Sequence, residues 1–437
     1  MSAGLEIIAD PEILSEGSLE ERACFAAVEI RYGSTSLTES YDEFVKRVRT
    51  APMLSAYHLA EWMAWNWWRL RWEPRSNLPD WAFAHRLPSI GEGYVWPNVT
   101  IFSDGERVAL IARPTQERLT TRFRYLADGA AVVAAPEFEY IVDQFIEQVR
   151  GLLRAQDVPE SNLDRLWRDI HIERNDPALA RRRKLEALLG QGPDENEAAF
   201  VRLVSNDGLL GARAVDEIAA DYRHAHDLLV ATRLRDLGSH GGFDFLPNQA
   251  VRLNAPVAFS SLGEVPAWRL GADAAIALRA QEGLGEGPIR NDRLAELVAV
   301  SVCALTPPPG DSDVSFALQT GRDAGRIVLR SKWETGRRFD LARLLGDRLV
   351  GADGESLLPA TRAYTYRQKM QRSFAAELLS PFNQVDQSLS GDYSSESQEH
   401  VAEYFQVSPL TIRTLLVNHR RLDREDLDEF DAVASFA

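Results

Sequence analysis

Hydrophobic and polar residues follow two different periods along the first 155 residues. Between Val99 and Ile111 they alternate with a period of two on both sides of an Asp-Gly pair, which predicts two strands joined by a hairpin turn. Shorter strands are expected at 123–126 and 131–134, whereas residues 137–154 carry apolar side chains at helical spacing. The pattern predicts an α+β domain over 1–155, a small antiparallel sheet with helices on it.

Residues 57–72 form an aromatic segment that Pro74 ends, as proline does after a helix. Four tryptophans recur on one predicted helical face, which is typical of a helix packed against a sheet: Trp62, Trp65, Trp68 and Trp72. Trp67 lies off this face. Together with Arg69 and Arg71 it is the alternative candidate, a surface that binds a partner or a ligand.

The next region, 156–264, is helical in pattern and heavily charged, with breaks at 175–177 and 190–194. It predicts a helical middle region. Beyond it we expect a third domain over 265–422, followed by an acidic tail at 423–437.

Within 265–422 the pattern predicts helices at 268–282, 292–300 and 337–349, a strand at 323–330, and a later helix that ends at Pro381. The last two helices carry the most specific residues of the chain. In the first they are Arg338, Phe339, Leu341, Ala342, Leu345 and Gly346, and in the second Phe374, Ala375, Ala376, Glu377, Leu378, Leu379 and Pro381.

These residues, in this order, resemble the ImmA/IrrE family of HExxH metallopeptidase-like proteins, over roughly residues 267–422. The resemblance implies a zincin-like domain and a setting of bacterial stress response, mobile elements or phage-related regulation. The working side chains differ. Arg343 stands at the first zinc histidine, Leu344 at the catalytic glutamate and Asp347 at the second histidine. The acidic ligand falls near Gln368 or Met370, neither of which is a carboxylate.

A zinc site of this type needs two neutral imidazoles, a third ligand and a carboxylate base. A guanidinium stays protonated and cannot ligate a metal, and leucine cannot act as a base. We therefore expect a degenerate motif without metal or cofactor. Arg343 and Asp347, at i and i+4, are expected to pair in place of the metal. The alternative is a pocket in which Arg343 binds a phosphate or a carboxylate.

Residues 399–416 resemble a helix-turn-helix, with Ser408 as the cap of the second helix and Pro409 at its first position. Such a pair either packs as part of the domain or contacts DNA. The side chains that would reach DNA are Thr411, Arg413, Thr414 and Arg420.

Composition narrows the classes of function. The formal net charge of −16 disfavours a DNA-coating role. The two cysteines, Cys24 and Cys303, cannot build a disulfide scaffold, and Cys303 is expected to be buried in an apolar run. No apolar run approaches the roughly 18 residues of a membrane span, and the amino terminus is acidic. We expect a cytoplasmic bacterial protein without membrane contact.

The sequence thus predicts a non-catalytic pseudo-metallopeptidase that acts by binding an unidentified protein partner or a small ligand. The first alternative is a transcriptional regulator that binds DNA through 399–421. The second is an active hydrolase whose metal ligands lie elsewhere. Nothing in the pattern indicates an oligomeric state.

Overall fold

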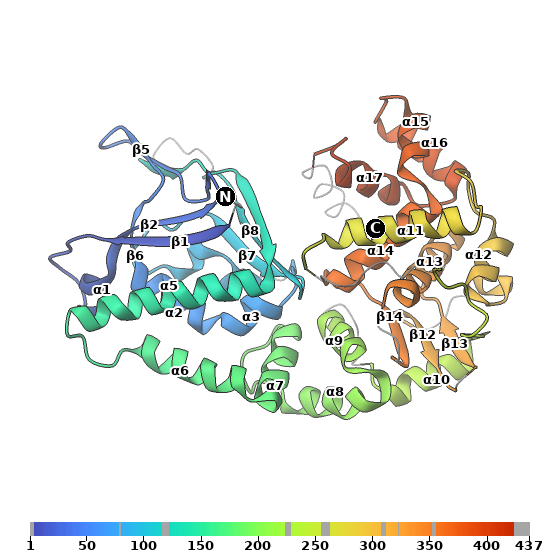
Figure 1. The fold of residues 1–437 in the computed structure, drawn as a ribbon, viewed down its shortest axis with the longest axis horizontal. Helices are drawn as coiled ribbons and strands as arrows, with labels where there is room; N and C mark the ends of the chain where they lie inside the picture. Colours follow the sequence, from blue (N-terminus) through green and yellow to red (C-terminus); the bar gives the residue numbers. More distant parts are fainter. Residues whose placement is uncertain are drawn as a thin grey trace. The chain divides into compact units, whose positions relative to one another are not determined.

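The computed structural model describes residues 4–77, 80–115, 122–222, 229–254, 263–306, 312–321, 323–351 and 355–423. Contacts divide the chain into two compact units, Met1–Phe200 and Val201–Ala437. The division falls inside the helical region expected at 156–264. Both units combine helices with small antiparallel sheets, which confirms the α+β class (Figure 1). The acidic tail beyond Asp423 lies outside the described residues.

The described part of the amino-terminal unit contains three small antiparallel sheets. The first consists of β1 (Leu5–Pro11), β2 (Phe25–Tyr32), β3 (Thr35–Ser36) and β6 (Met53–Ser55). The second consists of β7 (Val99–Ser103), β8 (Arg107–Ala112) and β10 (Gly129–Ala134), and the third of β4 (Ser40–Asp42), β5 (Arg47–Arg49) and β9 (Phe123–Tyr125). The predicted hairpin is confirmed as β7 and β8. Its turn places Gly105 at φ +99°, a conformation that glycine adopts without steric cost.

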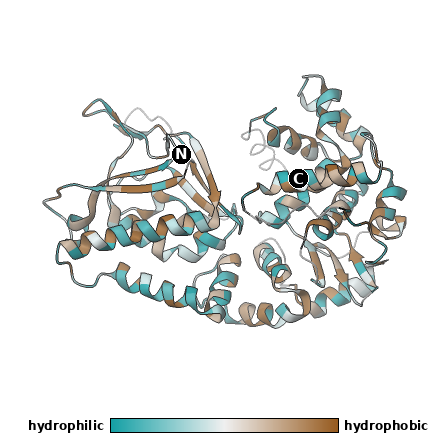
Figure 2. Ribbon diagram, in the orientation of Figure 1, coloured by the Kyte–Doolittle hydropathy of each residue, from teal (hydrophilic) through white to brown (hydrophobic). Residues whose placement is uncertain are grey.

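Helices pack against these sheets and against one another. They are α1 (Leu19–Cys24), α2 (Ala56–Trp65), α3 (Trp67–Trp72), α4 (Trp81–His85), α5 (Ala135–Ala155), α6 (Asn162–Asn175) and α7 (Pro177–Leu188). The long helix α5 packs on β1, and hydrophobic and hydrophilic residues are interspersed along its length (Figure 2). Its buried side chains include Phe138, Val142, Phe145 and Val149, at the spacing that the sequence predicts.

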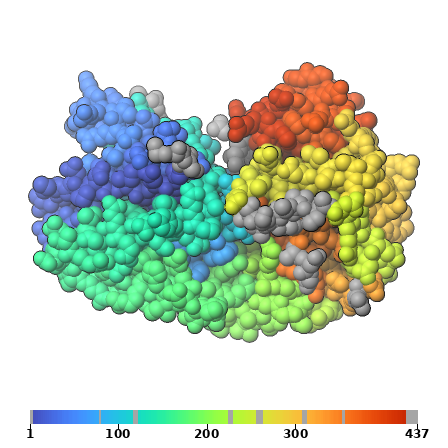
Figure 3. Space-filling view, viewed as in Figure 1, coloured from blue at the N-terminus to red at the C-terminus, as the bar shows by residue number. Residues whose placement is uncertain are grey.

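One part of this unit projects from its body. The hairpin of β4 and β5 stands out in the space-filling view (Figure 3) and exposes Phe44 and Val45 in its turn and Val48 in β5. Phe44 lies under the guanidinium of Arg122, 5.2 Å from the ring centroid. An arginine thus covers one side of the most exposed ring of this turn.

The carboxy-terminal unit is built around the sheet β11 (Phe243–Phe245), β13 (Gly325–Val328), β12 (Ser315–Gln319) and β14 (Leu357–Ala360), in this order. Before it in the chain lie α8 (Glu197–Leu210), which spans the division between the units, α9 (Ala212–Asp221) and α10 (Ala231–Gly241). The other helices are α11 (Ala267–Gln281), α12 (Asn291–Val298), α13 (Glu334–Val350), α14 (Tyr366–Leu379), α15 (Phe382–Leu389), α16 (Ser395–Phe405) and α17 (Pro409–Asn418).

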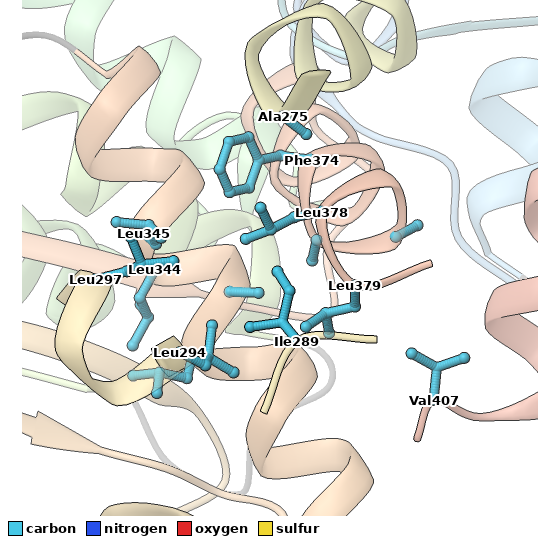
Figure 4. Close-up of a cluster of buried hydrophobic side chains, with 14 of the residues drawn as sticks. Ala275, Ile289, Leu294, Leu297, Leu344, Leu345, Phe374, Leu378, Leu379 and Val407 are labelled. Atoms are coloured by element: carbon cyan, nitrogen blue, oxygen red, sulfur yellow. The ribbon is translucent and has the colours of Figure 1, made fainter. Parts of the chain in front are cut away.

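The helices α11 and α13 both pack against α14. Two glycines allow this approach, because a Cβ atom at Gly271 would meet the backbone of Met370, and one at Gly346 would meet the ring of Phe374. Leu344 and Leu345 of α13 join Leu378 and Leu379 of α14 in the hydrophobic core (Figure 4). The close packing places the polar side chains of α13 and α14 beside each other.

Candidate functional site

The aromatic segment forms two helices rather than one. The helix is interrupted at Asn66, which has φ −99° and ψ 10° and lies between α2 and α3. This interruption shifts the helical pattern of the residues that follow it. Trp67 is buried, at 2% exposure, and packs edge-on against Trp167 with the ring centroids 5.5 Å apart, whereas Trp65 is 71% exposed. The segment lies in the core as predicted, and Trp62 and Trp68 of the predicted face are half-buried against it. Trp65 of that face is exposed, however, and Trp67, which the pattern places off the face, is buried.

The proposed partner surface of Trp67, Arg69 and Arg71 is wrong as well. Arg69 pairs with Glu73 at 2.6 Å. Arg71 is buried and binds Glu139 at 2.5 Å and the carbonyl oxygen of Gly105 at 2.8 Å. The guanidinium of Arg69 is thus paired locally, that of Arg71 joins distant segments of the amino-terminal unit, and the buried Trp67 offers no surface to a partner.

The four degenerate positions all lie in the carboxy-terminal unit, Arg343, Leu344 and Asp347 on α13 and Gln368 on α14. All four side chains are buried. Leu344 belongs to the hydrophobic core. Arg343 and Gln368 contact Thr361, which follows β14, and Asp347 contacts Arg367 near the amino-terminal end of α14. The structure joins Arg343 to Gln368 but leaves Asp347 to another partner.

Arg343 is 3% exposed and donates hydrogen bonds through both terminal nitrogens. Its Nη2 donates to the carbonyl oxygen of Thr361 at 2.6 Å and to Oε1 of Gln368 at 2.5 Å. Its Nη1 lies 3.5 Å from Oδ1 of Asp340. Its buried Nε has no hydrogen-bond partner among the described residues. The guanidinium is therefore held mainly by neutral oxygens, with one distant carboxylate.

Gln368 is positioned by the turn that leads into α14. Its Oε1 also accepts a hydrogen bond from the amide of Thr361 at 2.8 Å, and its Nε2 donates to the carbonyl oxygen of Pro359 at 3.0 Å. The hydroxyl of Thr365 caps the helix by accepting from the amide of Gln368 at 3.2 Å. The amide group thus ties α14 to the end of β14 and to α13.

The expected pair of Arg343 and Asp347 is wrong. Asp347 accepts hydrogen bonds from Nε and Nη2 of Arg367, each at 2.7 Å, and Arg367 also pairs with Glu355 at 2.8 Å. Helical side chains lean towards the amino terminus of their helix. Arg343 accordingly reaches back to Asp340, and the carboxylate one turn further on is left to Arg367 of α14.

A wider polar network surrounds this point. Ser315 of β12 donates to Oδ2 of Asp340 at 2.6 Å and accepts from the amide of Arg330 at 2.9 Å. Arg372 of α14 donates to the carbonyl oxygens of Thr361 at 3.2 Å and Ala363 at 2.8 Å. The network therefore includes residues from the sheet and from both helices.

On the side of α9, two carboxylates approach the same turn. Asp221 accepts a hydrogen bond from the amide of Arg362 at 2.9 Å, and Glu217 accepts one from the hydroxyl of Thr365 at 2.7 Å. A cavity of about 10 Å³ is lined by Asp221, Thr361 and apolar side chains of α9, β12 and β14. It has room for about one water molecule.

Burial sets the electrostatics of this network. It lowers the pKa of Arg343 to about 9, and the charge of Arg372 adds to the effect. Burial also raises the pKa of Glu217 to about 7, against the charge of Arg367. Arg343 is still protonated at neutral pH, so the network holds a cation with little compensation.

The residues present do not fit the zinc ion that the resemblance implies. Arg343 has no free lone pair, Leu344 has no donor atom, and both oxygens of Asp347 are bound to Arg367. Within the described ranges, no three histidine, cysteine, aspartate or glutamate side chains are grouped so that they could hold a metal.

The helix pair expected near the carboxy terminus is present as α16 and α17, and Ser408 caps α17 through a hydrogen bond of 3.2 Å from the amide of Thr411. Thr411 itself is buried, so it is not available to a DNA base. The hydroxyl of Thr414 donates to the carbonyl oxygen of Leu410 at 2.8 Å. Arg413 is half-buried and Arg420 is exposed. The residues proposed to contact DNA thus differ in exposure, from the buried Thr411 to the exposed Arg420.

The two cysteines differ in exposure. Cys303 is exposed, so its expected burial is wrong, whereas Cys24 is buried. The apolar run around Cys303 forms a short 3₁₀ turn, Val302–Leu305, that buries only Ala304 and Leu305.

Among the residues that the structure describes, no helix has the length and apolarity that crossing a membrane requires.

Comparison with known proteins adds no relative. No protein-family model, no curated protein and no solved structure matches the chain. The resemblance to the ImmA/IrrE family therefore rests on the residues of α13 and α14 alone, and the function is inferred from the geometry of the chain itself.

Proposed function

We propose that this chain is a non-catalytic, metallopeptidase-like protein of the bacterial cytoplasm that acts as a regulatory protein by binding a partner or a ligand. One observation carries the proposal: the positions equivalent to the zinc ligands and the base hold a guanidinium, a leucine, a carboxylate bound to Arg367 and an amide bound to Arg343. These side chains join helices and offer neither a base nor a metal ligand.

The packing of α13 on α14 supports the proposal that the chain keeps a metallopeptidase-like fold without the catalytic side chains. The apolar residues that carry the resemblance, such as Leu345, Phe374 and Leu378, form the core of the carboxy-terminal unit. The resemblance thus follows the residues that pack α13 on α14, and it fails where a peptidase needs its reactive groups. A chain that keeps the packing residues is expected to act through its surface and its pockets.

Metal analysis tests the proposal. Purified protein is incubated with zinc, dialysed, and measured by mass spectrometry for bound metal, with the Asp347→Ala variant in parallel. We expect far less than one zinc atom per chain in both. Stoichiometric zinc that disappears in Asp347→Ala, together with zinc-dependent cleavage of a protein substrate, would overturn the proposal in favour of an active hydrolase.

A further inference from the structure

The small sheet of β4, β5 and β9 carries positive charge on an acidic chain. Residues 40–49 and 122–125, which form this sheet, contain five basic and two acidic side chains, whereas the whole chain has a net charge of −16. Lys46, Arg47 and Arg122 are exposed, and Arg49 is half-buried. Among the described residues none of these four side chains forms an ion pair. These cations are therefore available to a partner outside the chain.

Several exposed arginines elsewhere in the amino-terminal unit bind carboxylates of the chain itself, as Arg113 binds Asp128 and Arg168 binds Glu160. Such pairs satisfy a guanidinium within the chain. In the sheet, by contrast, even the buried Nε of Arg49 has no hydrogen-bond partner among the described residues. The basic side chains of the sheet thus differ from these paired arginines.

Apolar side chains lie among the cations. Val48 is 51% exposed and lies opposite Tyr41 in the ladder between β5 and β4. In the turn before β5, Phe44 is 77% exposed and Val45 is exposed as well. Exposed aromatic and aliphatic side chains next to arginines are typical of the centre of a protein–protein interface. The surface therefore favours a partner that is both acidic and apolar.

The strand β5 lies at the edge of its sheet. The strand order is β5, β4, β9, and among the described residues no strand pairs with the outer side of β5 (Figure 1). An edge strand can accept an extended segment of another protein, whose backbone continues the ladder. Side chains alternate along a strand, so Arg47 and Arg49 lie on one face of β5 and Val48 on the other.

We propose that β5 binds an extended segment of a partner protein in which acidic and apolar residues alternate. The acidic side chains of this segment bind Arg47 and Arg49, and its apolar side chains pack on Val48 and Tyr41. The inference goes beyond the proposed function. It concerns a surface of the amino-terminal unit and does not depend on the positions that replace the zinc ligands.

Other occupants fit this surface less well. A second copy of β5, paired antiparallel around Val48, would set Arg47 opposite Arg49, and like charges directly opposite each other destabilise a ladder. A nucleic acid or an anionic lipid surface is a large polyanion, which the net charge of −16 repels. Asp42 and Glu43 at the end of β4 would add to this repulsion. A short acidic segment carries far less charge, so the cations of the sheet can decide its binding.

Fluorescence anisotropy of a labelled peptide of alternating glutamate and valine tests the proposal, with the full chain at low ionic strength. We expect saturable binding that weakens as sodium chloride is added. Peptides with lysine in place of glutamate, or serine in place of valine, should bind at least about 10-fold more weakly. Arg47→Gln and Val48→Thr should each weaken binding about 3- to 10-fold, because each removes one contact of an exposed side chain.

The matched controls are Arg168→Gln and Ile13→Thr, which change an ion-paired arginine and an exposed apolar residue elsewhere in the same unit. Both should bind the peptide as the wild type does. Wild-type affinity in either Arg47→Gln or Val48→Thr, or no binding of the peptide by the wild type, would overturn the proposal. Tighter binding of phosphatidylglycerol vesicles or of oligothymidylate, lost in Arg47→Gln, would overturn it in favour of a lipid or a nucleic acid. None of these outcomes changes the zinc content, so a failure here is distinct from a failure of the non-catalytic role.

Discussion

The carboxylate of Asp347 is bound by Arg367 through two hydrogen bonds of 2.7 Å, and this pair joins α13 to α14 at the level where the resemblance would place a metal. The geometry is the bidentate one in which arginine binds a carboxylate most strongly. It also explains why Arg343 has only a distant carboxylate, because the nearest acidic side chain on the following turn is already occupied.

Asp347→Asn should destabilise the carboxy-terminal unit by about 2–4 kcal/mol, because the substitution leaves the largely buried Arg367 with Glu355 as its remaining carboxylate. Urea denaturation followed by circular dichroism measures the change. The control is Asp386→Asn, which breaks the more exposed pair with Arg421 and should have a much smaller effect. Equal effects of the two variants would contradict a structural role of the Asp347 pair.

Arg343→Met should change the free energy of unfolding by less than about 1 kcal/mol, despite the burial of this residue. Each group that Arg343 contacts keeps another hydrogen bond: the Thr361 carbonyl keeps Arg372, Gln368 keeps the Thr361 amide, and Asp340 keeps Ser315. The removed charge is itself costly to bury. Replacement can therefore be neutral or stabilising.

Arg367→Met is the matched control for Arg343→Met, since it also replaces a buried arginine of the same network. It leaves Asp347 without its arginine and should cost about 3 kcal/mol. Similar losses in the two variants, measured by the same urea titration, would show that Arg343 is a structural residue rather than an uncompensated cation retained for binding.

Elements with local signals could be predicted from the sequence. The Asp-Gly turn between β7 and β8, the amphipathic pattern of α5 and the cap at Ser408 each depend on residues close in the chain, and each is present in the structure. Short strands such as β12 and β14 lack such a local signal, and β12 in particular is buried on both faces and shows no alternation.

The choice of partners within the site could not be predicted. The spacing of Arg343 and Asp347 allowed a pair, but the outcome depends on α14, which brings Gln368 to one residue and Arg367 to the other. Similarly, the break at Asn66 decides which tryptophan is buried, and no proline or glycine marks it. Tertiary packing rather than local propensity determines both results.

Stability should depend on pH through Glu217, whose burial raises its pKa to about 7, above the ordinary value of 4.5. A raised carboxyl pKa favours the protonated form in the folded state. Ionisation therefore costs no stability below about pH 4.5 and costs progressively more up to about pH 7. The neighbouring charges are Arg367, which favours ionisation, and Asp347, which opposes it.

Glu217→Gln removes this cost. The variant should be more stable than the wild type at about pH 8, by at most about 3 kcal/mol, and close to it at about pH 5. Urea denaturation at the two pH values measures the difference. Glu399→Gln, at an exposed position of α16, should show no such dependence. A difference for Glu217→Gln that is the same at both pH values would contradict the raised pKa.

The two thiols should differ in reactivity. Cys303 is exposed, whereas Cys24 is fully buried, with its Sγ 3.8 Å from the carbonyl oxygen of Val149. Burial raises the pKa of Cys24 to about 12, with a smaller effect of Glu20, so the thiolate that reacts is nearly absent at neutral pH. A native sample treated with Ellman's reagent should release one equivalent rapidly and the second only after denaturation. Cys303→Ser should abolish the rapid phase, and Cys24→Ser should leave it intact. A rapid phase that survives in Cys303→Ser would show that the amino-terminal unit opens around Cys24 in the native state.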